Sequence, residues 1–283
     1  MEREKLIKEI RRTAIRMRKH SLDMALVAGS NGAHLGPGYS MAELTAALYK
    51  GVMHHDPENP RMEDRDRFVL SKGHGVLGYF PILAECGYFP VELLKTFETL
   101  DSPLAGHPSI HQDMGIDFST GSLGHGLSLG VGLALGARQK GSPSITYVYM
   151  GDGETNEGSV WEAAMAAKQF RLSNLVAVID HNRIQSDGLS RDIMDLERIE
   201  DMWKAFGWKV RVIDGHNVEE ILDAFQERNR ASDRPYMVIA RTVKGKGATL
   251  FENDNTWHHN KLTQEQYDEV MKELNSWEES LCR

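Results

Sequence analysis

The chain has 283 residues, 41% of them hydrophobic and 26% charged, so it is long and apolar enough to build a sizeable core. This composition excludes disordered and collagen-like architectures. Lys plus Arg number 33 against 41 Asp plus Glu, which gives a net charge of −8 with both signs interspersed along the chain. Nucleic acid is therefore disfavoured as a partner, because phosphate backbones are bound by concentrated positive charge.

Cysteine usage and hydropathy indicate the compartment. The two cysteines, Cys86 and Cys282, are far apart and form no Cys-x-x-Cys pair, which predicts reducing surroundings and no disulfide framework. The opening segment MEREKLIKEIRRTAIRMRKH carries both charges and no apolar stretch of signal-peptide length. No apolar run reaches the roughly 20 residues that cross a bilayer. We expect a cytoplasmic protein with no membrane partner.

Two amphipathic helices are predicted in the first part of the chain. Apolar residues recur at helical spacing over 3–27 and again over 41–52, the second helix with Ser40 as its expected N-cap. The intervening segment SNGAHLGPGYS is rich in glycine around His34. A loop of this composition can bring its backbone close to a ligand.

Strands and helices alternate in the rest of the chain. Short β-branched and aromatic runs separated by helical patterns indicate βαβ crossovers, and hence an α/β fold with a mostly parallel sheet covered by helices on both faces. No linker or repeat interrupts residues 1–283, so we expect one domain, closed by a helix from about residue 263 with Thr263 at its start. The predicted strands are 145–150, 175–180, 208–213 and 236–241, and the helices between them are 155–171, 194–206 and 217–230.

Polar residues follow two of these strands, where ligands of open α/β sheets bind. Gly151-Asp152-Gly153 ends one strand, and Asn182 ends the next, followed by Ile184. A carboxylate, an amide oxygen and a main-chain carbonyl are hard ligands that suit Mg²⁺, with Ca²⁺ or Mn²⁺ as alternatives, and do not suit zinc. Alone, Gly-Asp-Gly is also a common structural turn.

Six further segments occur together with this motif. The strand-end pattern resembles the thiamine diphosphate fold motif, and the set as a whole, spanning about residues 30 to 259, resembles the transketolase family. The resemblance implies the diphosphate-binding (PP) domain, and the length matches the N-terminal subunit of a split transketolase. The segments are NGAHLGPGYSMAEL, DRDRFVLSKGHG, LAGHP, FSTGSLGHGLSLGVGLALGA, FGWKVRVIDGHN and RTVKGKGATLFENDNTWHH.

The resemblance assigns expected roles residue by residue. Asp152, Asn182 and Ile184 would hold the metal. Gly151 and Gly153 would let the backbone approach the diphosphate. Other matched positions are His74 at the diphosphate and Gly121, Ser122 and Leu123 packing on the cofactor. His34 and His258 match histidines that face the reacting sugar and the cofactor's reactive carbon, and His107 matches another active-site histidine. Glu157 and Glu162 match acidic positions at the contact between paired cofactor sites.

The implied enzyme moves a two-carbon ketol unit from a ketose, by default a sugar phosphate, to an aldose. Thiamine diphosphate supplies the electron sink for such chemistry. The family's glutamate that contacts the cofactor's pyrimidine lies in another domain, which the segment after residue 259 is too short to provide. We therefore expect activity only with a separate C-terminal, pyrimidine-binding subunit, as an α₂β₂ assembly.

Other functions compete with this interpretation. The chain could belong to a 1-deoxyxylulose-5-phosphate synthase-like or 2-oxoacid dehydrogenase-like thiamine enzyme, or be a non-catalytic binding subunit. The segment GHGLSLG, residues 124–130, imitates the dinucleotide turn of a nicotinamide-dependent oxidoreductase, but no convincing strand precedes it.

Several residues keep two interpretations. Lys244 and Lys246 in KGKG fit a solvated turn as well as a functional loop. His125 stands where the family usually has glutamine, and His181 where an acidic or aromatic residue is common, so either could alter the pocket. His216 and His259 have no assigned role.

Overall fold

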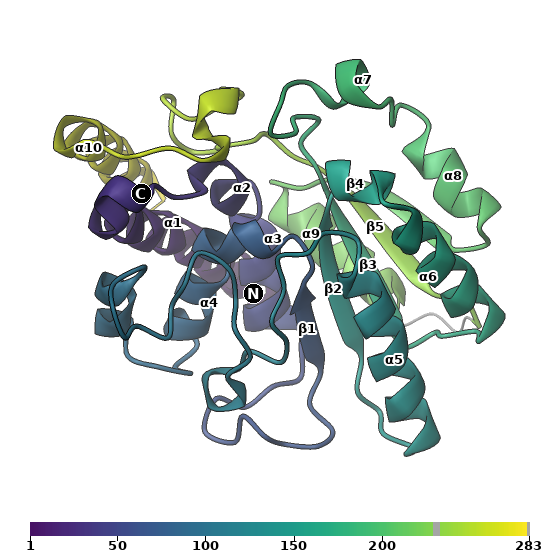
Figure 1. Ribbon diagram of the computed structural model, residues 1–283. Coiled ribbons are helices and arrows are strands. Elements are labelled where there is room, and N and C mark those ends of the chain that lie inside the picture. Colours follow the sequence, from purple (N-terminus) through teal and green to yellow (C-terminus); the bar gives the residue numbers. More distant parts are fainter. Residues whose placement is uncertain (229–232, 282–283) are drawn as a thin grey trace.

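The computed structural model describes residues 1–228 and 233–281. Five parallel strands form a sheet in the order β1-β2-β3-β5-β4 (Figure 1). Four of them confirm the predicted strands, whereas β1 was not predicted because it has only four residues. The strands are β1 (Arg67–Leu70), β2 (Thr146–Gly151), β3 (Leu175–His181), β4 (Lys209–Asp214) and β5 (Tyr236–Arg241).

Ten α-helices lie in the described part of the chain, together with short 3₁₀ turns and one π-helical turn. The α-helices are α1 (Glu2–Ala28), α2 (Leu35–Tyr39), α3 (Ala42–Ala47), α4 (Phe80–Glu85), α5 (Gly126–Gln139), α6 (Gly158–Gln169), α7 (Ser190–Ile193), α8 (Ile199–Ala205), α9 (Val218–Arg228) and α10 (Gln264–Ser280). The 3₁₀ turns are η1 (Gly29–Asn31), η3 (Gly73–Gly78), η4 (Val91–Thr96), η5 (Gln112–Met114), η6 (Gly153–Asn156) and η7 (Asn255–His258), and the π-helical turn is η2 (Leu48–Val52).

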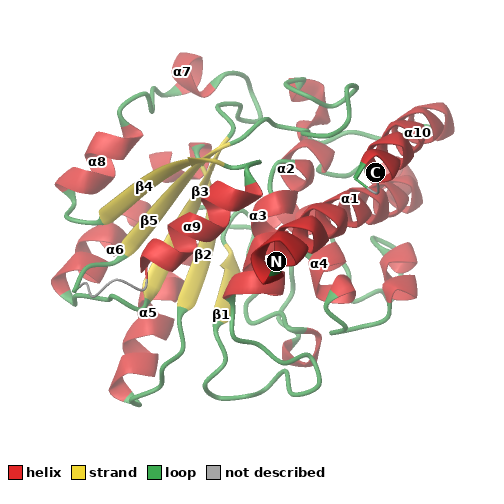
Figure 2. Ribbon diagram, turned by 180° about the vertical axis from the view of Figure 1, so that it is seen from behind, coloured by secondary structure: helices red, strands yellow, loops and turns green. Residues whose placement is uncertain are grey.

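Helices cover both faces of the sheet, as the sequence predicts. Alternate strand residues point to opposite faces. Tyr147, Tyr149 and Val178 pack in one apolar cluster with α1, α3 and α9, whereas Val148 and Ile179 pack in another with α5, α6 and α8. The first set of helices lies in front of the sheet in Figure 2, which views the molecule from behind, and the second set lies in front of the sheet in Figure 1. Continuous apolar strands are thus buried on both sides.

Some predicted boundaries were wrong. Ser40 does not cap a helix: α3 begins after Met41, and the Ser40 hydroxyl donates to Asp180 Oδ2 at 2.6 Å. The predicted helix 194–206 begins only at Ile199. The last residues of the predicted helix 217–230 lie outside the described ones. The C-terminal helix is confirmed, with a capping box between Thr263 and Gln266.

One unexpected helix bears on the competing interpretations. Residues 126–139 form α5, although their glycine content disfavours a helix. The segment 124–130 opens this helix after a long irregular stretch and not after a strand. This is not the strand–turn–helix geometry that a dinucleotide-binding turn requires.

A buried ion pair joins the carboxyl ends of the strands. Lys72, just after β1, donates to Asp180 in β3 at 2.5 Å, and the two side chains are 1% and 0% exposed. Asp180 also accepts from Ser40 and from Thr242, which follows β5. Lys72 donates a second bond to the Pro37 carbonyl at 2.8 Å. These bonds fix α2, β1, β3 and β5 relative to one another.

Two smaller findings concern cysteine and membranes. Cys86 is a free thiol, while Cys282 lies outside the described residues. Across residues 1–228 and 233–281, no helix is both long enough and apolar enough to cross a membrane.

Lys72→Met should destabilise the chain by about 3–5 kcal/mol, because it leaves the Asp180 carboxylate buried without its counter-ion. Urea denaturation measures the free energy of unfolding. Lys261→Met, at an exposed position, is the control and should change it little. Equal stabilities for the two variants would contradict a central role for the ion pair.

Candidate functional site

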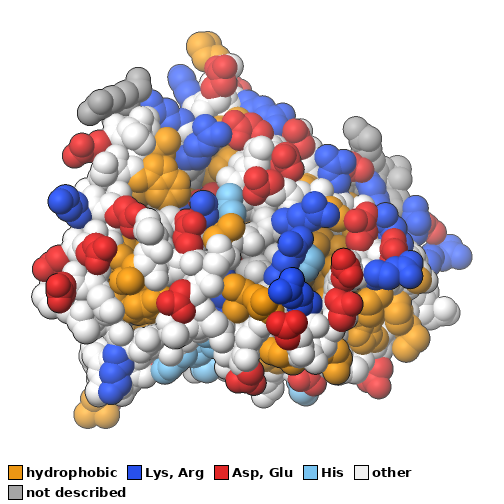
Figure 3. Space-filling model, turned by 90° about the horizontal axis from the view of Figure 1, so that it is seen from above, with side chains coloured by type: hydrophobic (Ala, Val, Ile, Leu, Met, Phe, Trp, Pro, Cys, Tyr) orange, Lys and Arg blue, Asp and Glu red, His pale blue; other side chains and the backbone are white. Residues whose placement is uncertain are grey.

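The predicted metal ligands meet at the carboxyl edge of the sheet. Figure 3 looks onto this edge, where histidine and basic side chains emerge among acidic and apolar ones. Asp152 is buried, and its carboxylate accepts from the backbone N–H groups of Gly153 and Arg183, each at 2.7 Å. Burial, followed by the negative charge of Asp180, raises the pKa of Asp152 to about 6. No cationic side chain of the described residues forms a salt bridge with Asp152 within 4.0 Å.

Asn182 and Ile184 continue this arrangement. The Ile184 N–H donates to Asn182 Oδ1 at 3.0 Å, and the Asn182 amide donates to Asp180 at 3.2 Å. Arg183, between them, has a φ of 65°, which turns its N–H toward Asp152. The described residues contain no cluster of three or more His, Cys, Asp or Glu side chains that could hold a metal. The predicted metal ligands are one carboxylate, one amide oxygen and one main-chain carbonyl, so they do not form a cluster of that composition.

Four predicted histidines come together beside this edge. The ring of His34 lies 5.4 Å from His74, 5.9 Å from His107 and 5.5 Å from His258, measured between centroids. His259, which had no assigned role, is nearer still at 4.4 Å. A pair of backbone hydrogen bonds between Ala33 and Asn260, at 2.8 and 3.1 Å, joins the two histidine-bearing segments. We call these five side chains the histidine cluster.

Burial keeps much of the histidine cluster neutral. Burial, followed by nearby histidines and Lys244, lowers the pKa of His34 to about 3 and that of His258 to about 4. Burial and the charge of Lys72 hold the pKa of His74 well below its usual range. At neutral pH these rings are unprotonated and can accept a proton.

Lys244 is a site residue that the sequence left undecided. Its side chain is 1% exposed, so the solvated-turn interpretation is wrong. The ammonium donates to the Ile184 carbonyl at 3.0 Å and lies 2.9 Å from Nδ1 of His258. Burial and the charge of Lys72 lower the pKa of Lys244 to about 8. A cation therefore links the predicted metal ligands to the histidine cluster.

A second buried network holds the segment that carries Lys244. Arg18 donates two bonds to Glu43, at 2.7 and 2.8 Å, and a third to the Lys246 carbonyl at 2.7 Å. His216 Nδ1 lies 3.0 Å from Glu43, and its Nε2 accepts from the Val243 N–H at 2.9 Å. His216 thus accepts a hydrogen bond from the backbone next to Lys244 and is not part of the histidine cluster.

Glu154 joins three loops and was not predicted as a site residue. Its buried carboxylate accepts from the Ser71 hydroxyl, from the Gly124 N–H at 2.9 Å and from the Gly151 N–H at 3.1 Å. These donors belong to the SKGHG, GSLG and Gly-Asp-Gly segments. Its position inside Gly-Asp-Gly-Glu was the only sequence signal, because the partners are distant along the chain.

Glycine allows close packing where these loops meet. A Cβ atom on Gly73 would stand 2.8 Å from the Gly121 nitrogen, and one on Gly153 would stand 2.7 Å from the Gln185 side chain. Gly121 itself has a φ of 143°, and its nearest neighbour is the ring of His107. The loop of Gly121 therefore packs directly against the histidine cluster.

The remaining predicted residues lie at the surface. Ser122 is exposed and Leu123 half-buried just before α5. Glu157 is the N-cap residue of α6 but makes no capping hydrogen bond, and Glu162 is exposed on the same helix. His125 is exposed, with its ring 3.1 Å from the Leu123 carbonyl. None of these side chains has a ring contact with the histidine cluster among the described residues.

The chain is similar to known proteins over most of its length. Residues 10–280 match the family model for the transketolase thiamine diphosphate binding domain. The 6-deoxy-6-sulfo-D-fructose transketolase subunit SqwG of Clostridium sp. (strain MSTE9) is 45% identical, over 85% of this chain and 88% of that protein. An apulose-4-phosphate transketolase subunit of Phocaeicola vulgatus is 41% identical, over 90% and 91%.

Solved structures give the same result. Transketolase from Leishmania mexicana superposes with a TM-score of 0.85 and 28% identity, covering 94% of this chain and 41% of that one. The chain therefore spans about two fifths of this longer protein, and its sheet and helices match the predicted fold.

His34 and His258 should each contribute a rise in the free energy of unfolding with pH between about 4 and 6.5, opposite in sign to the contribution of Asp152, whose folded pKa is raised to about 6. His34 and His258 have folded pKa values below the usual 6.5, so the unfolded chain binds more protons in this window. His34→Asn should flatten the rise, as urea denaturation at several pH values would show. Exposed His111→Asn is the control, and equal slopes for the two variants would contradict the assignment.

Glu154→Gln should weaken binding of thiamine diphosphate with Mg²⁺ about 10- to 100-fold, since an amide NH₂ would face backbone donors where the carboxylate accepts. Tryptophan fluorescence during cofactor titration measures the affinity. Exposed Glu269→Gln is the matched control. The same affinity in both variants would show that Glu154 does not position the loops.

Proposed function

The chain belongs to the transketolase family and carries its thiamine diphosphate binding domain, and from this premise we propose how its residues serve ketol transfer. The observation that carries the proposal is the meeting of Asp152, Asn182, Ile184 and the histidine cluster at one edge of the sheet. In the proposed reaction, a two-carbon ketol unit passes from a ketose to an aldose.

The predicted ligands fit a divalent cation. Asp152 is a buried carboxylate without an ion-pair partner in the described chain, and such a charge is costly unless a cation neutralises it. Asn182 Oδ1, which accepts from the Ile184 N–H, and the Ile184 carbonyl, which accepts from Lys244, add two hard oxygens from the same turn. This donor set favours Mg²⁺, with Ca²⁺ or Mn²⁺ as alternatives.

The chain's own groups divide into binding and proton-handling roles. Bound thiamine diphosphate would supply the electron sink for carbon–carbon cleavage. Lys244 and His74 would face its diphosphate, and Gly153 and the 121–123 loop would let backbone approach it. His34 and His258, both neutral at pH 7, would accept and return the sugar hydroxyl protons, with His107 beside them.

We propose that a second polypeptide completes the enzyme. Relatives named as transketolase subunits match this chain almost end to end, whereas a one-chain transketolase is more than twice as long. The partner would supply the pyrimidine-binding domain in an α₂β₂ assembly. Glu157, the N-cap residue of α6, and Glu162 on α6 are exposed and available for the contact between paired cofactor sites.

The substrate class follows less directly from this half of the enzyme. The two relatives are named for a sulfonated sugar and a sugar phosphate, which differ in the anionic group. We propose a sugar phosphate as the substrate, with a modified sugar such as the sulfonated one as the alternative. Groups that bind the sugar's anionic end would lie mainly on the partner subunit.

Asp152→Ala should reduce metal-dependent affinity for thiamine diphosphate by at least about 100-fold, because it removes the only charged ligand proposed for the cation. Calorimetric titration with and without Mg²⁺ measures this change. Asp187→Ala, an exposed carboxylate in the neighbouring loop, should bind as the unmodified chain does. Unchanged binding by Asp152→Ala would mean that the site is elsewhere.

Reconstitution tests the subunit proposal. The purified chain is assayed for ketol transfer with thiamine diphosphate and Mg²⁺, alone and with a pyrimidine-binding subunit from the same organism. We expect turnover only from the pair. Turnover by the lone chain would refute the need for a partner, and cofactor binding without turnover by the pair would favour a non-catalytic subunit.

A further inference from the structure

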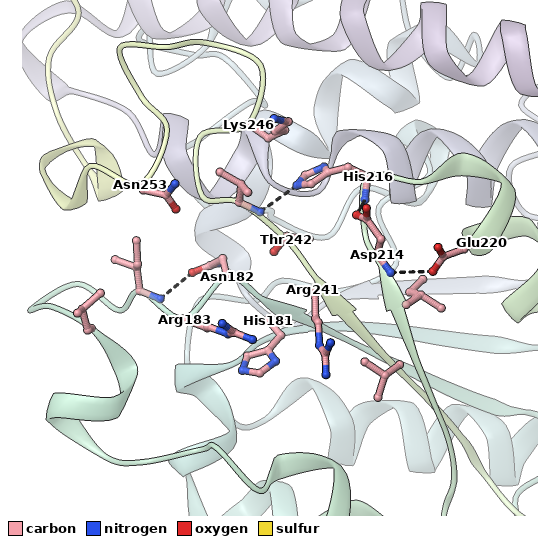
Figure 4. Close-up of a pocket in the computed structure, with 15 residues that line it drawn as sticks. His181, Asn182, Arg183, Asp214, His216, Glu220, Arg241, Thr242, Lys246 and Asn253 are labelled. Carbon is pink, nitrogen blue, oxygen red and sulfur yellow. Dashed lines mark hydrogen bonds between the residues drawn. The ribbon is translucent and has the colours of Figure 1, made fainter.

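A second set of cationic side chains lies next to the proposed metal ligands. A cavity of about 980 Å³ opens beyond the ends of β3, β4 and β5, and Asn182 and Ile184 form part of its wall. Figure 4 shows the guanidinium groups of Arg183 and Arg241 on either side of the His181 ring inside this cavity. We call these three side chains and the space they face the basic pocket.

The strand register explains why the cations gather. In the parallel pairing of β3 with β5, His181 lies directly opposite Arg241. Side chains opposite each other on neighbouring strands interact, so an acidic residue at 181 would pair with Arg241. This is the position where His181 departs from the family pattern. The departure leaves Arg241 with an imidazole opposite it on β3 and Arg183 two residues further along, while Asp214 lies opposite Arg241 on β4.

The groups in the basic pocket lack partners. Within the described residues, the exposed guanidinium groups of Arg183 and Arg241 form no hydrogen bond or ion pair with the protein, and the buried His181 Nδ1 has no partner. Figure 4 shows the three side chains next to one another. Two exposed guanidinium groups and one buried, unpaired ring nitrogen therefore line the same cavity.

The acidic groups in the same cavity are already occupied. Asp214 accepts from the His216 N–H at 2.9 Å, and Glu220 accepts from the Asp214 N–H at 3.0 Å. Figure 4 shows both near the end of β4, away from Arg183. Lys246, the other cation of the wall, pairs with Glu252 at 3.2 Å. Neither acid forms an ion pair with the arginines of the basic pocket.

From this arrangement we propose that the basic pocket binds the tetrahedral oxyanion of a small metabolite, a phosphate monoester or a sulfonate. Two guanidinium forks and a ring nitrogen match the several oxygens of such a group. The cavity is larger than the anion, so it has room for the attached carbon skeleton. The basic pocket adjoins the proposed metal site, because Asn182 and Ile184 also line this cavity, but the proposal does not depend on ketol transfer.

The test measures anion binding while the cofactor site is filled. Inorganic phosphate or methanesulfonate is titrated calorimetrically into the full chain at low salt, with saturating thiamine diphosphate and Mg²⁺, and again without them. We expect saturable binding under both conditions, weakened at least 5-fold by Arg241→Ala and by Arg183→Gly. Glycine suits the positive φ at 183 and keeps its N–H, so this variant should fold.

Controls separate the basic pocket from other sources of anion binding. Arg198→Ala, an exposed arginine outside the cavity, should bind the anions as the unmodified chain does. Tighter binding of phosphate or of methanesulfonate identifies which oxyanion is preferred, and acetate, which is planar, should bind more weakly. Loss of binding on addition of thiamine diphosphate, no saturable binding, or equal binding by Arg241→Ala and Arg198→Ala would each overturn the proposal.

Discussion

The buried carboxylate of Asp180 is the interaction on which the site depends. It lies in the central strand β3, two residues before Asn182, and is bonded to Lys72, Ser40 and Thr242. These partners come from the glycine-rich histidine loop and from the segments that follow β1 and β5. A buried charge fixes the positions of its bonding partners, because the loss of any partner leaves a desolvated group unpaired. The strand ends therefore have a fixed relative position before any ligand binds.

Further buried networks extend this order to the loops. Glu154 joins the three glycine-containing segments, and the Arg18–Glu43–His216 network holds the backbone beside Lys244. Each network uses charged groups whose partners are distant in sequence. The glycines leave the backbone free to approach a ligand, while the networks remove the mobility that glycine would otherwise bring. Function and rigidity are thus supplied by different residues of the same loops.

The sequence predicted the parts of the site that carry local signals. Asp152, Asn182, His34, His74 and His107 stand in motifs at strand or loop ends, most of them flanked by glycine, and the alternation of strands and helices indicated the sheet that gathers them. Lys244 and Glu154 were not assigned because a charged residue in a turn is usually solvated, and their burial arises only from tertiary packing. Ser40 was misassigned for the same reason: its hydroxyl serves Asp180 and not a helix end.

The paired backbone bonds between Ala33 and Asn260 have a consequence for folding. They connect segments from opposite ends of the chain, and His34 and His258 approach each other only when that connection forms. Closing so long a loop is entropically costly and slow compared with forming local helices. The histidine cluster should accordingly assemble late, after the sheet exists, so that a nascent or partly folded chain does not yet hold His34 and His258 together.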